Sequence, residues 1–433
     1  MNYIKKMNLS WFNFNSYCKI LLIFFPLTII FGQSFVSLFY ILCFASFVII
    51  LKKINLKEFY KNFKYILYFF LYLILSSLLI NQINIINALI LLKFFFLFFF
   101  LIYSCLKLDQ KFFIKYSYYI IAIFFFIFFD LIFQKIYTYD FFGFVAEGSN
   151  LDRLTGPFGS KEYIPASYIY HICLPFVLYI LLNNFINKKL INYFISIFVF
   201  ISLVISIFIT GERIIFIMLL ATIIFYFFFY KKFLLKSLFA SLLCFIIIYF
   251  ISSFDGYYKN RYLTFINIIT AAKEKNTSFL DSQWGAHYLT SIEIIKNNFF
   301  FGKGARSFRV ECSNSSYEKI SSVSKDIRCS THPHNFYLEI LSETGIFGMI
   351  LFFIMVYKFL IILIKVIKKN FFDIRNLNYN IAIAHVIPTL VLLFPIKSSG
   401  AIFSNLYGLM FWSLFAFSYG FLLRAKNTHK NLF

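Results

Sequence analysis

Long apolar stretches recur along the whole chain and leave only short polar segments between most of them. About 20 apolar residues in an α-helix span the hydrocarbon core of a bilayer, where only helices or closed barrels satisfy their own backbone. About twelve stretches of suitable length lie at 18–32, 34–51, 63–82, 84–106, 117–136, 165–183, 190–210, 212–229, 233–251, 345–366, 378–396 and 401–424. Only 14% of the 433 residues are charged, against about a quarter in soluble domains. The sequence therefore predicts an all-α polytopic membrane protein with about 12 transmembrane helices.

The positive charge of the chain is concentrated in alternate loops. The formal net charge is +23, and basic residues cluster at Lys52, Lys53, Lys57, Lys61, Lys64, Lys107, Lys111, Lys115, Lys188, Lys189, Lys231, Lys232, Lys368, Lys369, Arg424, Lys426 and Lys430. Lysine and arginine are retained in cytoplasmic loops, and about 12 spans place all of these residues on one side. Both termini are then cytoplasmic, and the loops at about 137–164 and 252–335 face outward. This distribution explains the charge, so no nucleic-acid partner is expected.

The second outward loop ends in the most distinctive polar cluster of the chain, within the sequence CSTHPHNFYLEILSETGIFG. His332, His334 and Asn335 are followed by apolar residues at helical spacing, with Glu339 and Glu343 four residues apart on one face. The pattern predicts a helix that begins near Asn335. It also places imidazoles at a membrane surface.

The spacing of His334-Asn335, the helical segment and the glycines Gly345 and Gly348 closely resembles the signature of the O-antigen ligase and polymerase superfamily. Its members are membrane glycosyltransferases that use polyprenyl-diphosphate-linked glycans. The resemblance implies a bacterial inner-membrane enzyme whose active site faces the periplasm, with His334 as the base and His332 and Asn335 as substrate contacts. A neutral imidazole with a pKa near neutrality can take the proton of a sugar hydroxyl as that hydroxyl attacks the anomeric carbon.

Two arginines in outward turns are candidate ligands for the donor. Arg213 follows Thr210-Gly-Glu, and in the superfamily an arginine at this turn contacts the lipid diphosphate through its planar guanidinium. Arg153 opens the sequence RLTGPFG, which is similar to a branch of the same superfamily, and it or Lys161 is a candidate to line a glycan or diphosphate path. The alternative for Arg213 is a boundary arginine paired with Glu212. The alternative for the loop that contains Arg153 is a plain connection between spans.

The large loop also contains a tryptophan-bearing segment, an amphipathic segment at 289–300, and a G-x-G turn followed by arginines. This succession is similar to the superfamily pattern, with one departure. Many members carry a second phosphate-binding arginine near the position of Gln283. That role can pass to Arg261, Arg306 or Arg309, and His287 is a further polar contributor. A lone G-x-G is as often a plain turn as a phosphate site.

The cysteines fall into two groups. Cys18, Cys43, Cys105, Cys173 and Cys244 lie in apolar stretches and are expected to be packing residues, while two others share the large outward loop, Cys312 and Cys329. In an oxidising compartment this pair is expected to form a disulfide, which the chain-entropy model values at roughly 3 kcal/mol. The alternative is two free thiols.

The histidines of the outward loop could also suggest a metal. His287, His332 and His334 share this loop, whereas His171 and His385 lie in apolar stretches and are expected to be structural. Two histidines around one residue can ligate zinc. No metal and no cofactor are expected here, because the intervening proline constrains the pair, the disulfide uses the nearest sulfurs, and the superfamily reaction is metal-independent.

Three parts are expected: transmembrane helices 1–9 in residues 1–251, the periplasmic loop in 252–335, and helices 10–12 with a cytoplasmic tail in 336–433. The resemblance implies inverting transfer of a glycan from undecaprenyl diphosphate to lipid A-core oligosaccharide, in lipopolysaccharide biosynthesis. An O-antigen polymerase that joins lipid-linked repeat units is the close alternative, and a protein O-oligosaccharyltransferase is a third. An anion transporter is the alternative from another class, but internal repeats typical of transporters are not evident. The expected partners are the lipid-linked donor, a glycan or lipid A-core acceptor, and membrane lipids.

Overall fold

The structure, a computed structural model, is mainly helical in the part that it describes. It describes residues 14–52, 56–80, 89–146, 153–159, 164–186, 190–229, 242, 246, 249, 253, 256–258, 260, 262, 279–370 and 375–426. Within these ranges an isolated bridge pairs Tyr139 with Val145.

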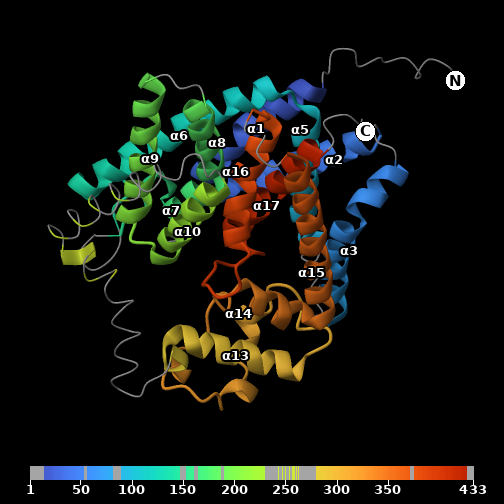
Figure 1. Ribbon diagram of the computed structural model, residues 1–433. Coiled ribbons are helices and arrows are strands. Elements are labelled where there is room, and N and C mark those ends of the chain that lie inside the picture. The colour runs from blue at the N-terminus through green and yellow to red at the C-terminus, as the bar shows by residue number, and fades with distance from the viewer. Residues whose placement is uncertain are drawn as a thin grey trace.

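The main helices follow the apolar stretches (Figure 1). They are α1 (Phe14–Ile30), α2 (Gln33–Leu51), α3 (Leu56–Ile80), α5 (Leu92–Lys107), α6 (Gln110–Tyr137), α7 (Ile164–Tyr168), α8 (Leu174–Ile186), α9 (Leu190–Ile209), α10 (Arg213–Phe229), α13 (Gln283–Asn297), α14 (Phe308–Glu311), α15 (Phe336–Asn370), α16 (Leu377–Leu392) and α17 (Asn405–Lys426). Short 3₁₀ turns lie at η1 (Gly156–Phe158), η4 (Phe279–Asp281), η5 (Ser315–Tyr317) and η6 (Lys325–Ile327), and a π-helical turn, η2 (Ile169–Cys173), joins α7 to α8.

The predicted fold class is confirmed: this is an all-α polytopic membrane protein. Seven helices in the described part of the chain are long and apolar enough to cross a membrane, and α1, α10 and α16 are shorter apolar helices. The number of about twelve spans stays a prediction, because most of the stretch at 233–251 lies outside the described residues. The boundaries of the three expected parts likewise stay predictions.

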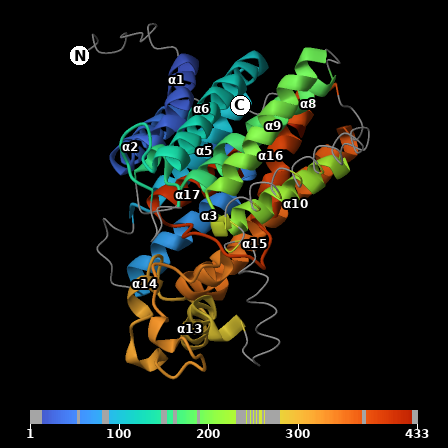
Figure 2. The same cartoon turned by 90° about the vertical axis from the view of Figure 1, so that its left-hand side faces the viewer.

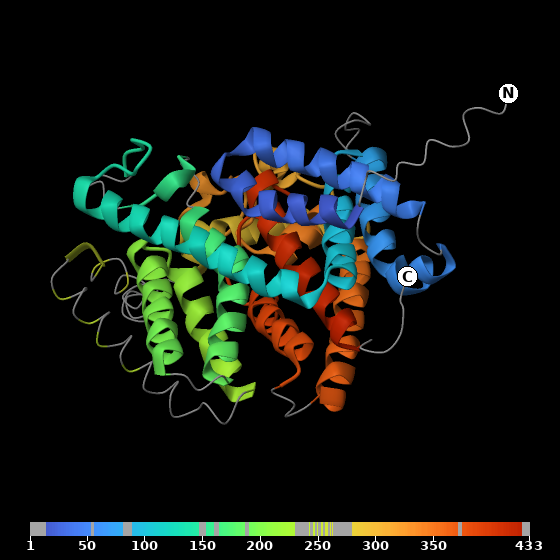
Figure 3. The same cartoon turned by 90° about the horizontal axis from the view of Figure 1, so that it is seen from above.

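Helix α17 lies at the centre of the bundle, as the view from above shows (Figure 3). Trp412 is fully buried there, with its ring centroid 5.1 to 6.4 Å from the rings of Phe69, Phe70, Phe94 and Phe98. These contacts join α3, α5 and α17. Because offset and edge-to-face aromatic pairs are favourable beyond their buried area, the phenylalanine-rich composition fixes this centre.

One end of the bundle is basic. The guanidinium of Arg424 donates to the carbonyl of Leu108 at 2.6 Å and to Asn378 Oδ1 at 2.9 Å, and Lys369 Nζ donates to the carbonyl of Lys426 at 3.3 Å. The ends of α5, α15 and α17 and the start of α16 therefore meet here. This end carries lysines that the sequence assigns to the cytoplasm.

The opposite end carries the histidine motif and the segment that contains α13 and α14, beneath the bundle in Figures 1 and 2. At this end Tyr337 Oη donates to the carbonyl of Leu393 at 2.6 Å, and the amide of Ala305 donates to Ser77 Oγ at 3.0 Å. The start of α15 thus lies beside the ends of α16 and α3. The basic end and the histidine end are separated by the length of the bundle.

The amphipathic segment expected at 289–300 begins earlier than the sequence analysis places it. Helix α13 begins at Gln283, so the tryptophan-bearing segment is its first turn rather than a separate element. Ser282 explains the difference, because its Oγ caps the helix by accepting from the amide of Gly285 at 3.2 Å. Gly285 also packs on the backbone, where an added Cβ would lie 2.3 Å from Leu280 Cα.

Candidate functional site

Three histidines form a cluster at the end of the bundle. The ring of His334 lies 4.3 Å from that of His332 and 5.1 Å from that of His287, measured between centroids. Two of them precede α15, and His287 comes from α13. The structure thus brings together the three histidines that the sequence places in one loop.

Hydrogen bonds fix the tautomers of two of these rings. His287 Nε2 lies 3.1 Å from the carbonyl of Ile327, and His332 Nε2 lies 3.0 Å from the carbonyl of Ser399. A carbonyl only accepts, so each Nε2 carries the hydrogen. His332 Nδ1 then accepts from Thr331 Oγ1 at 2.9 Å. Both rings are held in position by the protein.

His334 itself has an unusual backbone. Its φ is +57°, a left-handed conformation that costs a residue with a Cβ roughly 1–2 kcal/mol. The loop retains it through the His334 carbonyl, which accepts from the amide of Ser399 at 2.9 Å. The side chain is oriented by Ser330, whose Oγ lies 3.2 Å from Nε2. Strained backbone of this kind is concentrated at functional sites.

The cluster is neutral at physiological pH. Burial lowers the pKa of His334 to about 3, helped by the neighbouring His332 and His287. Burial also lowers the pKa of His332 to about 4 and shifts the pKa of His287 in the same direction. The expected pKa near neutrality for the proposed base is therefore wrong for the unliganded protein, because burial disfavours the imidazolium. His334 keeps the deprotonated form that a base requires.

Asn335 is used within the protein. Its Oδ1 caps α15 by accepting from the amides of Tyr337 and Leu338 at 3.0 and 3.2 Å. Its Nδ2 donates to the carbonyls of Pro395 and Lys397 at 2.8 and 3.2 Å. Asn335 thus fastens the histidine loop to the segment between α16 and α17, and its contact with substrate stays a prediction.

That segment contains a residue that the sequence analysis missed. Lys397 places its Nζ 5.6 Å from the centroid of the Phe336 ring, and burial lowers its pKa to about 7. Nζ is buried and has no hydrogen-bond partner among the described residues. A lone lysine in a turn that the sequence analysis assigns to the outward side, where lysines are scarce, was the available signal.

The G-x-G turn is a packing element. The carboxylate of Glu343 accepts from the amides of Arg306 and Phe308 at 2.6 and 3.3 Å, and the Glu343 carbonyl accepts from the amide of Gly304 at 2.7 Å. A Cβ on Gly302 would lie 2.4 Å from the Glu343 backbone. The turn therefore crosses α15 in backbone contact. These amides serve α15 and are not available to cradle a phosphate.

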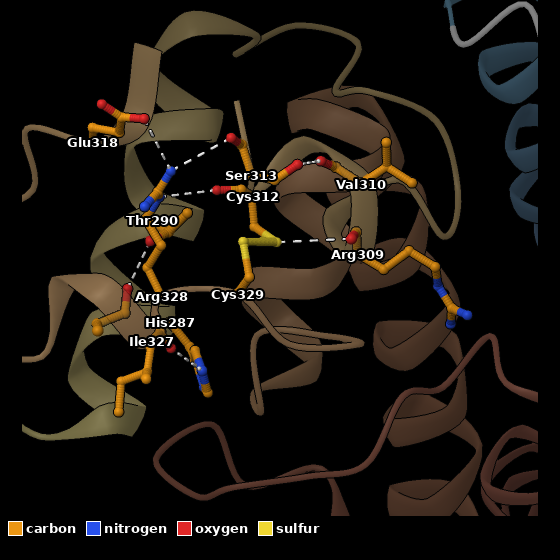
Figure 4. Close-up of a disulfide and its surroundings, with 11 residues drawn as sticks. His287, Thr290, Arg309, Val310, Cys312, Ser313, Glu318, Ile327, Arg328 and Cys329 are labelled. Atoms are coloured by element: carbon orange, nitrogen blue, oxygen red, sulfur yellow. Dashed lines mark hydrogen bonds and ion pairs between the residues drawn. A yellow bond between two sulfur atoms is a disulfide. The ribbon is translucent and has the colours of Figure 1, made fainter. Parts of the chain in front are cut away.

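The two arginines after this turn have exposed side chains. Arg309 points away from the disulfide in Figure 4, and its charge contributes to lowering the pKa of His332. Arg306 interacts electrostatically with Arg309 and Glu343. Both stay candidates for a substrate contact, while Arg261 lies outside the described residues.

A disulfide closes the segment beside α13 (Figure 4). Cys312 and Cys329 are joined with their Cα atoms 5.2 Å apart. Arg328 spans the same segment by donating to the carbonyls of Cys312 and Ser313 at 3.1 and 3.4 Å. The neighbouring carbonyl of Ile327 is the one that holds His287, so the covalent link restrains the support of the histidine cluster. Four other cysteines are buried and free, namely Cys18, Cys43, Cys105 and Cys173; Cys244 lies outside the described residues.

The two turns with candidate arginines, at Arg153 and just before Arg213, are joined to each other. Arg153 Nη2 lies 2.6 Å from Glu212 Oε1, with both side chains half-buried. Gln134 of α6 holds the turn after Arg153, because its Oε1 accepts from the amides of Thr155 and Gly156 at 2.9 Å each. Arg153 thus fastens the first outward loop to the turn that precedes Arg213. Lys161 lies outside the described residues.

Arg213 lies at the same end of the bundle as the histidines. Tyr170 Oη lies 2.8 Å from Thr222 Oγ1, and Tyr226 Oη donates to the carbonyl of Leu178 at 2.8 Å. Helix α10 therefore runs parallel to α8, and Arg213, its first residue, is level with the start of α7.

That level is the histidine end because α7 and η2 pack beside the start of α17. The ring of His171 lies 5.4 Å from that of Tyr407, and the segment just before α17 holds His332 through the Ser399 carbonyl.

Among the residues that the structure describes, no three His, Cys, Asp or Glu side chains are placed to hold a metal ion.

A comparison with known protein families gives a match. Residues 197–353 match the family model described as O-antigen ligase. The chain carries an O-antigen ligase family domain. The domain runs from α9 into α15 and includes Arg213, the disulfide and the histidine cluster. The family resemblance read from the sequence is confirmed. No protein among the curated sequences matches the chain.

Proposed function

We propose that this protein is a membrane glycosyltransferase that moves a glycan from undecaprenyl diphosphate to a sugar hydroxyl, with His334 as the general base. The single observation that carries the proposal is the cluster of three neutral imidazoles inside an O-antigen ligase family domain. The cluster lies at one end of a membrane bundle, opposite the basic end. We further propose that the basic end faces the cytoplasm of a bacterial inner membrane and that the cluster faces the periplasm.

The chemistry requires a base and positive charge rather than a nucleophile. The acceptor hydroxyl gives its proton to a ring nitrogen of His334 while its oxygen bonds to the anomeric carbon. The bond from that carbon to the diphosphate oxygen breaks, and the diphosphate leaves with the electron pair. Attack on the face opposite the leaving group inverts the anomeric configuration without a covalent intermediate or a metal.

The low pKa of His334 sets a condition on this mechanism. An imidazole with a pKa of about 3 is a weak base in the empty site. A bound diphosphate places negative charge near the ring, which favours the imidazolium and raises the pKa in the complex. Donor binding would therefore strengthen the base at the moment when it is needed.

Arginines would supply the charge that the leaving group requires. We propose that Arg213 binds the diphosphate, because it begins α10 at the histidine end. Arg153 then acts as a positioning residue through Glu212, which precedes Arg213 directly. Arg306 and Arg309 are proposed as further contacts for the glycan or the diphosphate, and His287 and His332 as residues that hold His334 and the acceptor.

For the acceptor we propose lipid A-core oligosaccharide, with polymerisation of lipid-linked repeat units as the alternative. The test is a deletion strain examined by gel electrophoresis of its lipopolysaccharide. Loss of a ligase leaves the core without glycan, while long lipid-linked chains accumulate. A core that carries a single repeat unit would instead identify a polymerase. Normal lipopolysaccharide with no accumulated lipid-linked glycan would refute both versions.

A further inference from the structure

Three buried polar atoms around the segment between α16 and α17 have no hydrogen-bond partner among the described residues. They are Lys397 Nζ, Ser399 Oγ and His171 Nε2. In folded proteins more than nine in ten buried polar groups are paired, so such a group usually marks a ligand, an ion or a bound water. Two of the atoms belong to this segment, and the third belongs to His171 in η2, whose ring lies 5.4 Å from that of Tyr407 in α17.

This segment is part of the wall of the histidine cluster. The carbonyl of Ser399 accepts from His332, and its amide donates to the carbonyl of His334. The carbonyl of Lys397 accepts from Asn335 at 3.2 Å. These three hydrogen bonds, two from Ser399 and one from the Lys397 carbonyl, hold the backbone of this segment against the histidine loop, although it is about 60 residues away in the chain.

The ammonium of Lys397 has no carboxylate counter-ion among the described residues. No ion pair in the described part of the structure includes it. His171 interacts with it electrostatically, but the Nδ1 of that ring lies 2.7 Å from the carbonyl of Ser167 and so carries the hydrogen. The remaining nitrogen, Nε2, is then an acceptor without charge. The carboxylate of Glu339, in the first turn of α15, accepts from the amide of Ile402 at 3.1 Å.

A buried cation without an anion is unfavourable, and the free energy improves when an anion binds. An ammonium is a compact point charge with three donors, which suits phosphate oxygens. The hydroxyl of Ser399 adds a further donor on the same segment.

We propose that Lys397 is an anion-binding residue of this site and that it receives a phosphate of the lipid-linked donor. The inference rests on the proposed function for the identity of the donor. It adds a lysine from the segment between α16 and α17 to the arginines of the domain.

The test measures binding to the purified full-length protein in detergent, with undecaprenyl diphosphate and inorganic pyrophosphate as separate probes. Lys397→Met removes the charge and keeps the length of the side chain, so we expect affinity for undecaprenyl diphosphate to fall about tenfold or more, the scale of a lost charged hydrogen bond. Lys319→Met is the matched control, because that lysine is exposed in the loop between α14 and α15, outside the segment that contains Lys397. It should bind like the unsubstituted protein.

The pH dependence separates charge from packing. Since burial lowers the pKa of Lys397 to about 7, binding should weaken as pH rises from about 7 to 9 and the ammonium loses its proton. Lys397→Arg keeps its charge over this range, so its affinity should stay level. The nearby His332 and His334 are neutral throughout, and a purely structural role for Lys397 would not give the two proteins different profiles.

The outcomes are distinguishable. Equal affinity of Lys397→Met and the unsubstituted protein for undecaprenyl diphosphate would overturn the inference and leave the proposed function standing. Failure of the unsubstituted protein to bind this lipid would overturn the proposed donor. Pyrophosphate that binds through Lys397 as tightly as the lipid would support the anion site but refute the lipid as its source. If Lys397→Met is misfolded, the pH comparison with Lys397→Arg still decides.

Discussion

The pKa of His334 predicts an unusual pH dependence of transfer. A base works in its deprotonated form, and burial with two neighbouring imidazoles lowers the pKa of this ring to about 3. Because a lowered pKa keeps the ring neutral to lower pH, the acid limb of kcat/KM should be displaced downward. The perturbation is a change of pH from about 7.5 to 5.5, across the ordinary histidine pKa of about 6.5.

The magnitude follows from the two pKa values. A ring with a pKa of about 6.5 is roughly 90% protonated at pH 5.5, so transfer would fall about tenfold. A ring with a pKa of about 3 is less than about 1% protonated at the same pH, so kcat/KM should change by less than about twofold. The acid limb of kcat should lie at higher pH than that of kcat/KM, because kcat reports the complex in which the diphosphate raises the pKa.

The assay uses purified protein in lipid nanodiscs with a fluorescent lipid-linked glycan and a core acceptor. Donor binding by His334→Ala, measured at both pH values, is the control that separates ionisation of the base from ionisation elsewhere. His332→Gln removes one of the imidazoles that oppose protonation of His334, so its acid limb should move toward neutral pH. A tenfold fall of kcat/KM in the unsubstituted protein with a midpoint near 6.5 would refute the reasoning.

Three further predictions address the architecture. Reporter fusions at Lys57 and Ser315 should report opposite compartments, with Ser315 outside, because they lie on opposite sides of the predicted topology. Peptides containing Cys312 and Cys329 should be recovered linked from non-reduced protein, and reduction should lower the free energy of unfolding by roughly 3 kcal/mol. Gly345→Ala should lower the thermal stability strongly, since an added Cβ would lie 2.3 Å from a backbone oxygen and φ is +65°.

Each of these three predictions has a control or an outcome that would contradict it. Gly143→Ala is matched to the glycine substitution, because it has φ of +85° but nothing within 4 Å of the added Cβ. An equal loss of stability in both variants would show that crowding at the crossing is not the cause. Two fusions that both report cytoplasm would reverse the proposed sidedness, and free thiols from intact cells would exclude the disulfide.

The parts of the fold that depend on local sequence were predictable. Apolar length identified the helices, and the alternation of basic loops is matched by the contacts of Arg424 and Lys369 at one end of the bundle. The helix after Asn335 begins where its cap predicts. These features need only neighbouring residues and the properties of the bilayer.

The site depends on contacts that no local pattern encodes. His287 reaches His334 only because α13 folds back against α15. The segment that contains Lys397 reaches the cluster because the Ser399 carbonyl accepts from His332 and the Lys397 carbonyl accepts from Asn335. The lowered pKa of His334 is a consequence of burial, which the sequence around it does not reveal. The G-x-G turn also could not be interpreted from its sequence alone. Its packing role is evident only from its backbone contacts with Glu343 of α15.

The most direct test of the central claim is single-turnover transfer by His334→Ala, measured together with its affinity for the lipid-linked donor. Removal of a general base should lower the transfer rate by about 10²- to 10⁴-fold and leave donor affinity unchanged. Arg213→Lys should show the other pattern, with weakened donor binding, because lysine keeps the charge but loses the bidentate guanidinium. A transfer rate in His334→Ala within about threefold of the unsubstituted protein would contradict the role of His334 as the base.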